Sequence, residues 1–176
     1  KGISEIISKA KKNLEGAKIF SYQVKNPHDF GVIEFHNNKI ISIEEKPLIP
    51  KSNYVVTGIY FYNNQVVSYA KTLKPSKRGE LEISDLNNIY LKSGKLQVEH
   101  LGRGFAWLDT GSHEALMEAS HFIQIIEKRQ GLKVACLEEI SLLNKWITYE
   151  KLKLDLKKMV DSSYKQYLTQ LIDENI

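Results

Sequence analysis

Tyr54-Val-Val-Thr-Gly-Ile-Tyr-Phe-Tyr62 is the stretch of sequence that decides the fold of this chain. Its β-branched and aromatic residues favour a strand. The run is apolar almost throughout, which is typical of a strand buried on both faces. We therefore expect residues 54–62 to form a central strand.

Shorter segments on the N-terminal side of this run also have strand patterns. Lys18–Val24 alternates in polarity and is followed by the turn residues Asn26-Pro27. Gly31–Phe35 and Lys39–Glu44 flank His36-Asn37-Asn38. Because asparagine tolerates positive φ, these two segments are expected to pair as a tight hairpin.

Helical periodicity and capping residues predict most of the remaining elements. The strongest helix begins after Ser112, carries an apolar stripe and ends near Gly131. Two short strands, Gln97–Leu101 and Phe105–Leu108, are expected around Gly102-Arg103-Gly104. The other expected helices cover residues 3–10 with Gly16 as the C-terminal glycine, a segment capped by Asn64 and reaching Leu73, Leu81–Leu91 closed by Gly94, a segment capped by Thr148, and Tyr164–Ile172.

These patterns divide the chain into two parts. Residues 1–131 mix strands and helices, whereas residues 132–176 have helical patterns and no strand pattern. The sequence therefore predicts an α/β domain over residues 1–131 and a helical C-terminal segment over residues 132–176.

Composition excludes several classes of protein. The 176 residues carry a formal net charge of +4, with 42% hydrophobic and 26% charged residues, which is ordinary for a globular chain. The chain has no run of five basic residues, no apolar stretch long enough to span a membrane and no signal peptide, so we expect no nucleic-acid or membrane partner. Cys136 is the single cysteine, which suits a reducing, cytoplasmic compartment. Because the sequence starts at Lys1 without a methionine and leads directly into a helical pattern, we expect a piece of a longer protein or a processed one.

Glu45-Lys46 is the first candidate for chemistry. A lysine ammonium can hold a phosphate, and a neighbouring carboxylate can accept hydrogen bonds from sugar hydroxyls. Neighbours on a strand point to opposite faces, so both side chains reach one ligand only if the strand ends here, which Pro47 favours. The alternative is a solvated ion pair.

Four further positions are candidates. Asp109 stands at an expected strand-to-helix turn, where a carboxylate suits magnesium, or alternatively caps the helix or braces the turn. Arg78 can clamp a phosphate or be solvated. Trp107 is either a core residue or part of a ligand site, and Gly31 either begins a strand or lets the backbone approach a ligand.

Other familiar sites are not supported by the pattern. The five histidines show no paired spacing, so a zinc site is not expected. Gly102-Arg103-Gly104 lacks the spacing and the lysine of a phosphate loop. No serine lies in a nucleophile elbow, and Cys136 has no sign of activation.

Taken together and in order, these pieces resemble the sugar-nucleotide pyrophosphorylases, and within them the glucose-1-phosphate thymidylyltransferases. The resemblance covers nearly the whole chain. It is carried by Asp29-Phe-Gly-Val-Ile-Glu-Phe35, Ile43-Glu-Glu-Lys-Pro-Leu48, Pro50-Lys-Ser-Asn-Tyr54, Val56-Thr-Gly-Ile-Tyr-Phe-Tyr62, Leu73-Lys-Pro-Ser76, Arg78-Gly-Glu-Leu-Glu-Ile83, Gly102-Arg-Gly-Phe-Ala-Trp-Leu-Asp-Thr-Gly111 and Arg129-Gln-Gly-Leu-Lys-Val-Ala-Cys136.

The resemblance implies a Rossmann-like α/β fold and a Mg²⁺-dependent reaction of dTTP with glucose 1-phosphate that gives dTDP-glucose, a precursor of dTDP-rhamnose, and pyrophosphate. It also implies a homotetramer in which the helical segment over residues 132–176 builds contacts between subunits. By the resemblance, Lys46, Arg78 and Asp109 are catalytic and share one crevice, with Asp109 as a magnesium ligand. The implied sugar-binding set is Gly31, Glu45, Lys46, Val56, Thr57, Tyr60, Arg78 and Trp107, and the implied regulatory nucleotide site is Arg103, Glu139 and Ile140.

The chain also departs from the family pattern. The glycine-rich phosphate loop, the base-reading residues and the other magnesium aspartate precede the point that matches Lys1 in the family, and none of them is found in this sequence. Phe30 stands where the family usually has tyrosine, and Leu137 where it has proline. We therefore expect the C-terminal three-fifths of such an enzyme, inactive alone. An enzyme that uses UTP or ATP, or a non-catalytic regulatory or assembly module, is the alternative.

Overall fold

The computed structural model describes residues 2–12, 14–37 and 39–174, and it divides into two compact units at Trp107 and Leu108. Lys1 and Asn38, on which two of the expectations above fall, lie outside the described residues. The first unit contains α1 (Ile3–Lys12), β1 (Ala17–Gln23), β2 (Gly31–His36), β3 (Lys39–Glu45), β4 (Tyr54–Tyr62), α2 (Val66–Thr72), α3 (Ile83–Lys92) and β5 (Leu96–His100). The second contains α4 (His113–Gln130), α5 (Leu137–Leu143), α6 (Tyr149–Leu156) and α7 (Ser163–Asp173).

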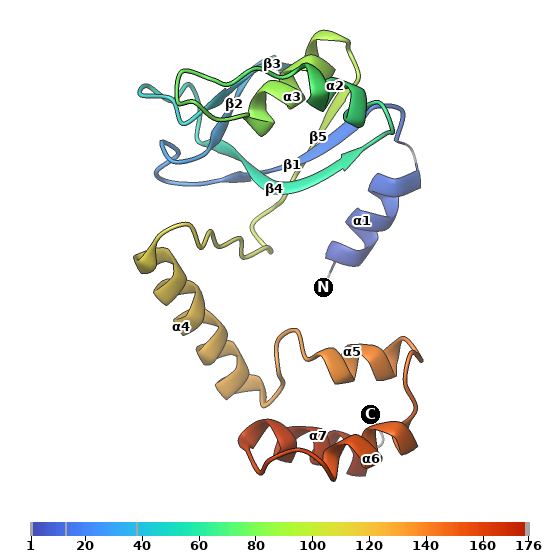
Figure 1. Cartoon of the computed structure of the whole chain (residues 1–176). Coiled ribbons are helices and arrows are strands. Elements are labelled where there is room, and N and C mark those ends of the chain that lie inside the picture. The colour runs from blue at the N-terminus through green and yellow to red at the C-terminus, as the bar shows by residue number, and fades with distance from the viewer. Residues whose placement is uncertain (1, 13, 38, 175–176) are drawn as a thin grey trace. The chain divides into compact units, whose positions relative to one another are not determined.

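A curled mixed sheet organises the first unit (Figure 1). Its strand order is β3-β2-β4-β1-β5, so β4 lies at the centre, as the sequence predicted. β1 is antiparallel to β4 and parallel to β5, while β2 is antiparallel to both β3 and β4. The α/β fold class and the predicted hairpin of β2 and β3 are therefore confirmed.

Helices cover both faces of this sheet. Alternation along β1 sends the fully buried Ile19 and Phe20 into separate apolar clusters. α2 and α3 lie together against one face, where Tyr90 packs on Ala17, and α1 contributes Ala10 to the cluster around Phe20 (Figure 1). Full burial of a side chain such as Ile19 or Phe20 stabilises the fold by about 1.5–3 kcal/mol.

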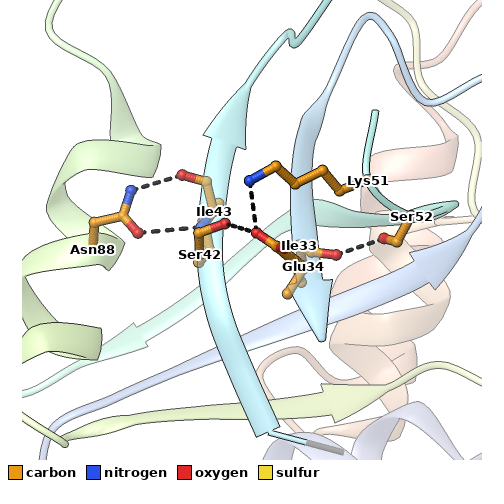
Figure 2. Close-up of polar contacts among 7 residues, drawn as sticks. All are labelled: Ile33, Glu34, Ser42, Ile43, Lys51, Ser52 and Asn88. Carbon is orange, nitrogen blue, oxygen red and sulfur yellow. Dashed lines mark hydrogen bonds and ion pairs between the residues drawn. The ribbon is translucent and has the colours of Figure 1, made fainter. Parts of the chain in front are cut away.

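The β2–β3 hairpin is held by side-chain hydrogen bonds (Figure 2). Glu34 Oε2 accepts from Lys51 Nζ at 2.9 Å and from Ser42 Oγ at 2.7 Å. These two hydrogen bonds, that from Lys51 first, hold the pKa of Glu34 below its usual value. On the outer edge, Asn88 of α3 accepts from the Ile43 amide at 3.2 Å and donates to the Ile43 carbonyl at 2.7 Å. Asn88 thus occupies the edge of β3 as a further strand would.

The second unit is helical, and two of its helices have the caps that the sequence predicted. Ser112 Oγ accepts from the Ala115 amide at 3.1 Å, and Gly131 ends α4 with φ 71°. Thr148 Oγ1 caps α6 in the same way, at 3.2 Å from the Lys151 amide. The apolar core of this unit consists of Cys136, Leu142, Leu152, Leu156, Leu168, Leu171 and Ile172.

Two predicted helix boundaries are wrong. α1 ends at Lys12, and Gly16 does not close it. A Cβ on Gly16 would lie 2.3 Å from the Lys95 carbonyl oxygen, so glycine is required by close backbone packing. The segment before α2 is organised by Asn63, whose Oδ1 accepts from the Gln65 amide at 3.1 Å, and not by Asn64.

The predicted strand Phe105–Leu108 does not form. Side chains from the sheet hold this segment instead. The Phe105 carbonyl accepts from the Tyr22 hydroxyl at 2.9 Å, and Trp107 Nε1 donates to the Thr57 carbonyl at 3.0 Å. The division between packed units falls directly after Trp107. The predicted boundary at Gly131 divides a sugar-phosphate-binding part from an assembly segment. It describes function and not compact packing units, and it stays a prediction.

Candidate functional site

Glu45 lies at the end of β3, opposite Gly31 at the start of β2. Its Oε2 accepts a short hydrogen bond from Ser84 Oγ of α3, and Ser84 is buried. A Cβ on Gly31 would lie 2.8 Å from Ser84 Oγ and 3.2 Å from Glu45 Oε2. The absence of a side chain at Gly31 therefore leaves space for the Ser84 hydroxyl and the Glu45 carboxylate to meet.

Val56 and Tyr60 of β4 complete this group of side chains. Val56 Cγ2 lies 3.8 Å from the position that a Gly31 Cβ would take. Burial, followed by the charge of Glu45, raises the pKa of the Tyr60 phenol to about 12. Gly31, Glu45, Val56, Tyr60 and Ser84 thus form one group, hereafter the Glu45 cluster. A carboxylate beside a phenol and a hydroxyl can accept and donate hydrogen bonds to a polyhydroxylated ligand.

Lys46 follows this cluster at a sharp change of backbone direction. β3 ends at Glu45, and Lys46 has the left-handed φ of 44°. Its amide donates to the Phe30 carbonyl at 3.0 Å, and its side chain is exposed while Pro47 is buried. A positive φ in a residue other than glycine is uncommon and costs free energy. The alternation of the strand ends here, which is the condition for Glu45 and Lys46 to serve one ligand.

Arg78 is not a free cation. Its guanidinium lies 3.1 Å from Glu80 Oε2 and 3.5 Å from Glu82 Oε1. Glu82 is nearly buried, with 10% of its side chain exposed, and also accepts from Ser76 Oγ at 2.8 Å. Arg78 is therefore neither simply solvated nor open to a ligand, and a phosphate would compete with the two carboxylates of its own loop.

Thr57 and Trp107 have structural partners. The Trp107 ring packs against Phe30 and Tyr22, with centroids 5.2 and 5.9 Å apart, in addition to its hydrogen bond with Thr57. Thr57 Oγ1 donates to the Phe20 carbonyl at 3.1 Å. Tyr22 and Phe20 belong to the apolar cluster on the α1 face, whereas Val56 and Tyr60 belong to the cluster on the opposite face. Trp107 is half-buried against Tyr22 and Phe30, and its place in the sugar-binding set stays a prediction.

The remaining predicted residues are distributed over the two units. Arg103 is exposed in the first. In the second, Asp109 is exposed and its Oδ2 accepts from the Gly111 amide at 3.0 Å, so it braces the turn while Ser112 caps the helix. Glu139 Oε2 accepts from Tyr167 at 2.6 Å, next to the half-exposed Ile140. The expected crevice draws on Lys46 and Arg78 of the first unit and on Asp109 of the second. The expected regulatory site also draws on both units. Both sites stay predictions.

The donor set for a metal is small. Within residues 2–12, 14–37 and 39–174, no three His, Cys, Asp or Glu side chains form a group that could hold a metal ion. Asp109 Oδ1 is a hard oxygen that fits Mg²⁺ as one ligand, and phosphate oxygens are the usual companions of such a carboxylate. The chain can therefore supply one ligand to a Mg²⁺ shared with a phosphorylated substrate.

Sequence reasoning missed Ser84 and Glu82. Ser84 of α3 holds Glu45 of a distant segment, whereas Glu82 holds Arg78 and Ser76 of its own loop. A signal was available for Ser84, because it directly follows the Arg78–Ile83 block and lies in the first turn of a predicted helix. A hydroxyl at that position is as easily assigned to helix capping as to a site.

Comparison with known proteins gives a consistent result. Residues 1–125 match the family model described as nucleotidyl transferase. The chain is 54% identical over 170 residues to a glucose-1-phosphate thymidylyltransferase from Neisseria meningitidis, covering 96% of this chain and 59% of the relative. It is 46% identical over 164 residues to that of Mycobacterium tuberculosis, covering 93% and 57%. The chain thus spans less than two thirds of the length of these relatives.

Solved structures agree with the fold. A Bacillus anthracis structure in complex with sucrose, named as a glucose-1-phosphate thymidylyltransferase, is 47% identical with a TM-score of 0.62, covering 69% of this chain and 49% of that one. A UDP-glucose pyrophosphorylase in complex with UDP-glucose, at 22% identity and a TM-score of 0.59, covers 68% and 48% and supports the fold alone. None of the described helices is long and apolar enough to cross a membrane.

Proposed function

The chain belongs to the nucleotidyl transferase family, and from this membership we propose that it forms the sugar-phosphate-binding part of a glucose-1-phosphate thymidylyltransferase. The observation that carries the proposal is the Glu45 cluster, in which a carboxylate is held by a buried serine beside a glycine that leaves room for it. The sequence identity of 46–54% to curated relatives with that name supports the choice of reaction.

In the proposed reaction, an oxygen of the phosphate of glucose 1-phosphate attacks the α-phosphorus of dTTP. The new oxygen–phosphorus bond forms as the bond from the α-phosphorus to the oxygen bridging to the β-phosphate breaks. The electron pair leaves on pyrophosphate, and dTDP-glucose is the other product. Such transfers depend mainly on positioning and on neutralisation of charge.

The residues of this chain divide that work. Glu45 accepts hydrogen bonds from sugar hydroxyls, and Ser84 fixes the carboxylate that does so. Lys46 meets the sugar phosphate as a compact charge, and Arg78 joins it after exchanging Glu80 for a phosphate oxygen. Because Glu82 holds Arg78 from a nearly buried position, it would keep the guanidinium in place during that exchange.

Four further features belong to the same proposal. Mg²⁺, when bound, neutralises charge on the phosphate oxygens, and Asp109 would hold it. Arg103, Glu139 and Ile140 would contribute to a regulatory nucleotide site at a subunit contact. The whole protein would be a cytoplasmic homotetramer that supplies dTDP-glucose for dTDP-rhamnose synthesis. The family resemblance supports these features.

Binding of the sugar phosphate tests the proposal directly. We expect glucose 1-phosphate to bind the chain in a calorimetric titration, and Glu45→Gln to weaken binding at least about tenfold, since charge-assisted hydrogen bonds are worth about 1.5–3 kcal/mol. Glu44→Gln is the matched control, because Glu44 is exposed and adjacent on the same strand. Absence of heat, or equal effects of the two substitutions, would contradict the proposal and favour an assembly module.

Catalysis is tested separately. We expect this chain alone not to exchange labelled pyrophosphate with dTDP-glucose, because it lacks a recognisable nucleotide cradle. In a full-length parent, Asp109→Asn should slow the chemical step by orders of magnitude through loss of metal-borne charge stabilisation. A near-normal rate would show that Asp109 only braces its turn.

A further inference from the structure

A cavity lies in the first unit, and none of its lining residues belongs to the Glu45 cluster. Its volume is about 320 Å³. Phe35, Ile40, Leu91, Leu96 and Val98 form its apolar walls. They come from β2, β3, α3 and β5, so the curl of the sheet and the covering helix create the cavity.

The strand pattern explains why apolar side chains form part of the cavity wall. Leu96, Val98 and His100 alternate to one face of β5 and line it, whereas Gln97 and Glu99 point to the other face. The apolar wall residues are half-buried, so each keeps apolar surface that the chain itself does not cover. A concave apolar wall of this kind is the usual setting of a small-molecule site.

Two polar side chains complete the lining, and both favour an anion. Lys39 is exposed at the start of β3. His100 Nδ1 lies 2.6 Å from the hydroxyl of the fully buried Ser21. Either atom can be the donor, and the site uses the tautomer in which the hydroxyl donates to Nδ1. The ring then carries its proton on Nε2, which becomes a donor.

We propose that this cavity is a binding site for a small, flat, apolar molecule that carries one carboxylate. The apolar walls accept the flat body, and the His100 ring, 5.3 Å from that of Phe35, adds an aromatic surface. The ammonium of Lys39 and the Nε2–H of His100 complement a carboxylate. Of the described residues that line the cavity, none carries a negative charge. The inference stands independently of the proposed function.

The test uses 2-naphthoate and its neutral analogue 2-naphthamide as probes of the 176-residue chain. In amide-detected NMR titrations, 2-naphthoate should shift the signals of Lys39, Ile40 and residues 96–100. The naphthamide should bind about threefold to fivefold more weakly, the range expected for one exposed ion pair. Equal binding of the two probes, or shifts confined to other regions, would overturn the proposal.

Substitutions separate the walls from the charge. Val98→Phe fills the cavity and should abolish the shifts, and Leu91→Trp fills it from α3 if the first variant fails to fold. Lys39→Gln, an exposed change, should remove the preference for the carboxylate and leave the neutral probe unaffected. Glu99→Gln, on the opposite face of β5, is the matched control. Unchanged binding in the filled variants, or a preference that survives Lys39→Gln, would refute the site.

Discussion

Replacing Gly31 with alanine tests the packing at the centre of the Glu45 cluster. The added Cβ would lie 2.8 Å from Ser84 Oγ, a distance that real contacts essentially never show. It would also lie 3.2 Å from Glu45 Oε2, which is the far end of a flexible side chain. Gly31 does not have a positive φ, so the backbone accepts alanine without strain. The cost therefore comes from Ser84.

The magnitude follows from that contact. Ser84 is 2% exposed and cannot move into solvent, so its hydroxyl must rotate and release Glu45. Overpacking of a buried site costs about 1–3 kcal/mol. Ser84→Ala removes the clashing atom, and in the Gly31→Ala background it should cost less than in the parent chain. We expect a coupling free energy of about 1–2 kcal/mol between the two substitutions.

Chemical denaturation of the four proteins of this double-mutant cycle measures the coupling. Gly102→Ala is the control, because a Cβ there meets no atom within 4 Å and Gly102 has no positive φ. It should change the free energy of unfolding by less than about 0.5 kcal/mol. Additive effects of Gly31→Ala and Ser84→Ala, or a Gly31→Ala chain as stable as the control, would refute the reasoning.

Three further predictions follow from other contacts. Glu80→Gln should tighten binding of glucose 1-phosphate about twofold to fivefold in calorimetry, because Arg78 loses a competing carboxylate of the exposed kind; unchanged affinity would mean that Arg78 does not meet the phosphate. Asn88→Ala should destabilise the chain by about 1–3 kcal/mol in urea denaturation, since two backbone groups at the edge of β3 lose their partner; a neutral effect would show that water replaces the amide. Burial and then Glu45 raise the pKa of Tyr60 from 10.0 to about 12, so the unfolded chain releases this proton at lower pH than the folded chain. The resulting stability is complete below about pH 10 and is lost as pH rises towards 12. Tyr60→Phe should therefore lessen alkaline destabilisation, as measured by circular dichroism during denaturation at a series of pH values.

Local signals predicted the elements that local physics determines. The apolar run at residues 54–62 became the central strand, and Ser112 and Thr148 cap the helices assigned to them. The predictions were wrong where contacts between distant segments determine the local structure. Gly16 was assigned to a helix end because glycine is common there. Its actual role, a close approach to Lys95, joins residues far apart in the sequence and leaves no local signal.

The candidate site divides in the same way. Gly31 and Glu45 were singled out by their positions at strand ends, and the structure brings them together through register, while their role in sugar binding stays a prediction. Ser84 was missed, and the structural partners of Trp107 were not foreseen, since both sets of partners depend on how α3 and the segment after β5 fold over the sheet. The alternation of residues along one strand does not predict which distant residue will contact that strand.

Asn88 has a consequence for how this molecule meets its neighbours. Outermost strands present unpaired amides and carbonyls to which foreign chains can add. Here a side-chain amide from the covering helix already occupies one such pair (Figure 2). Any chain that added at that point would first have to displace the helix. The tertiary packing of this unit therefore disfavours self-association by strand addition.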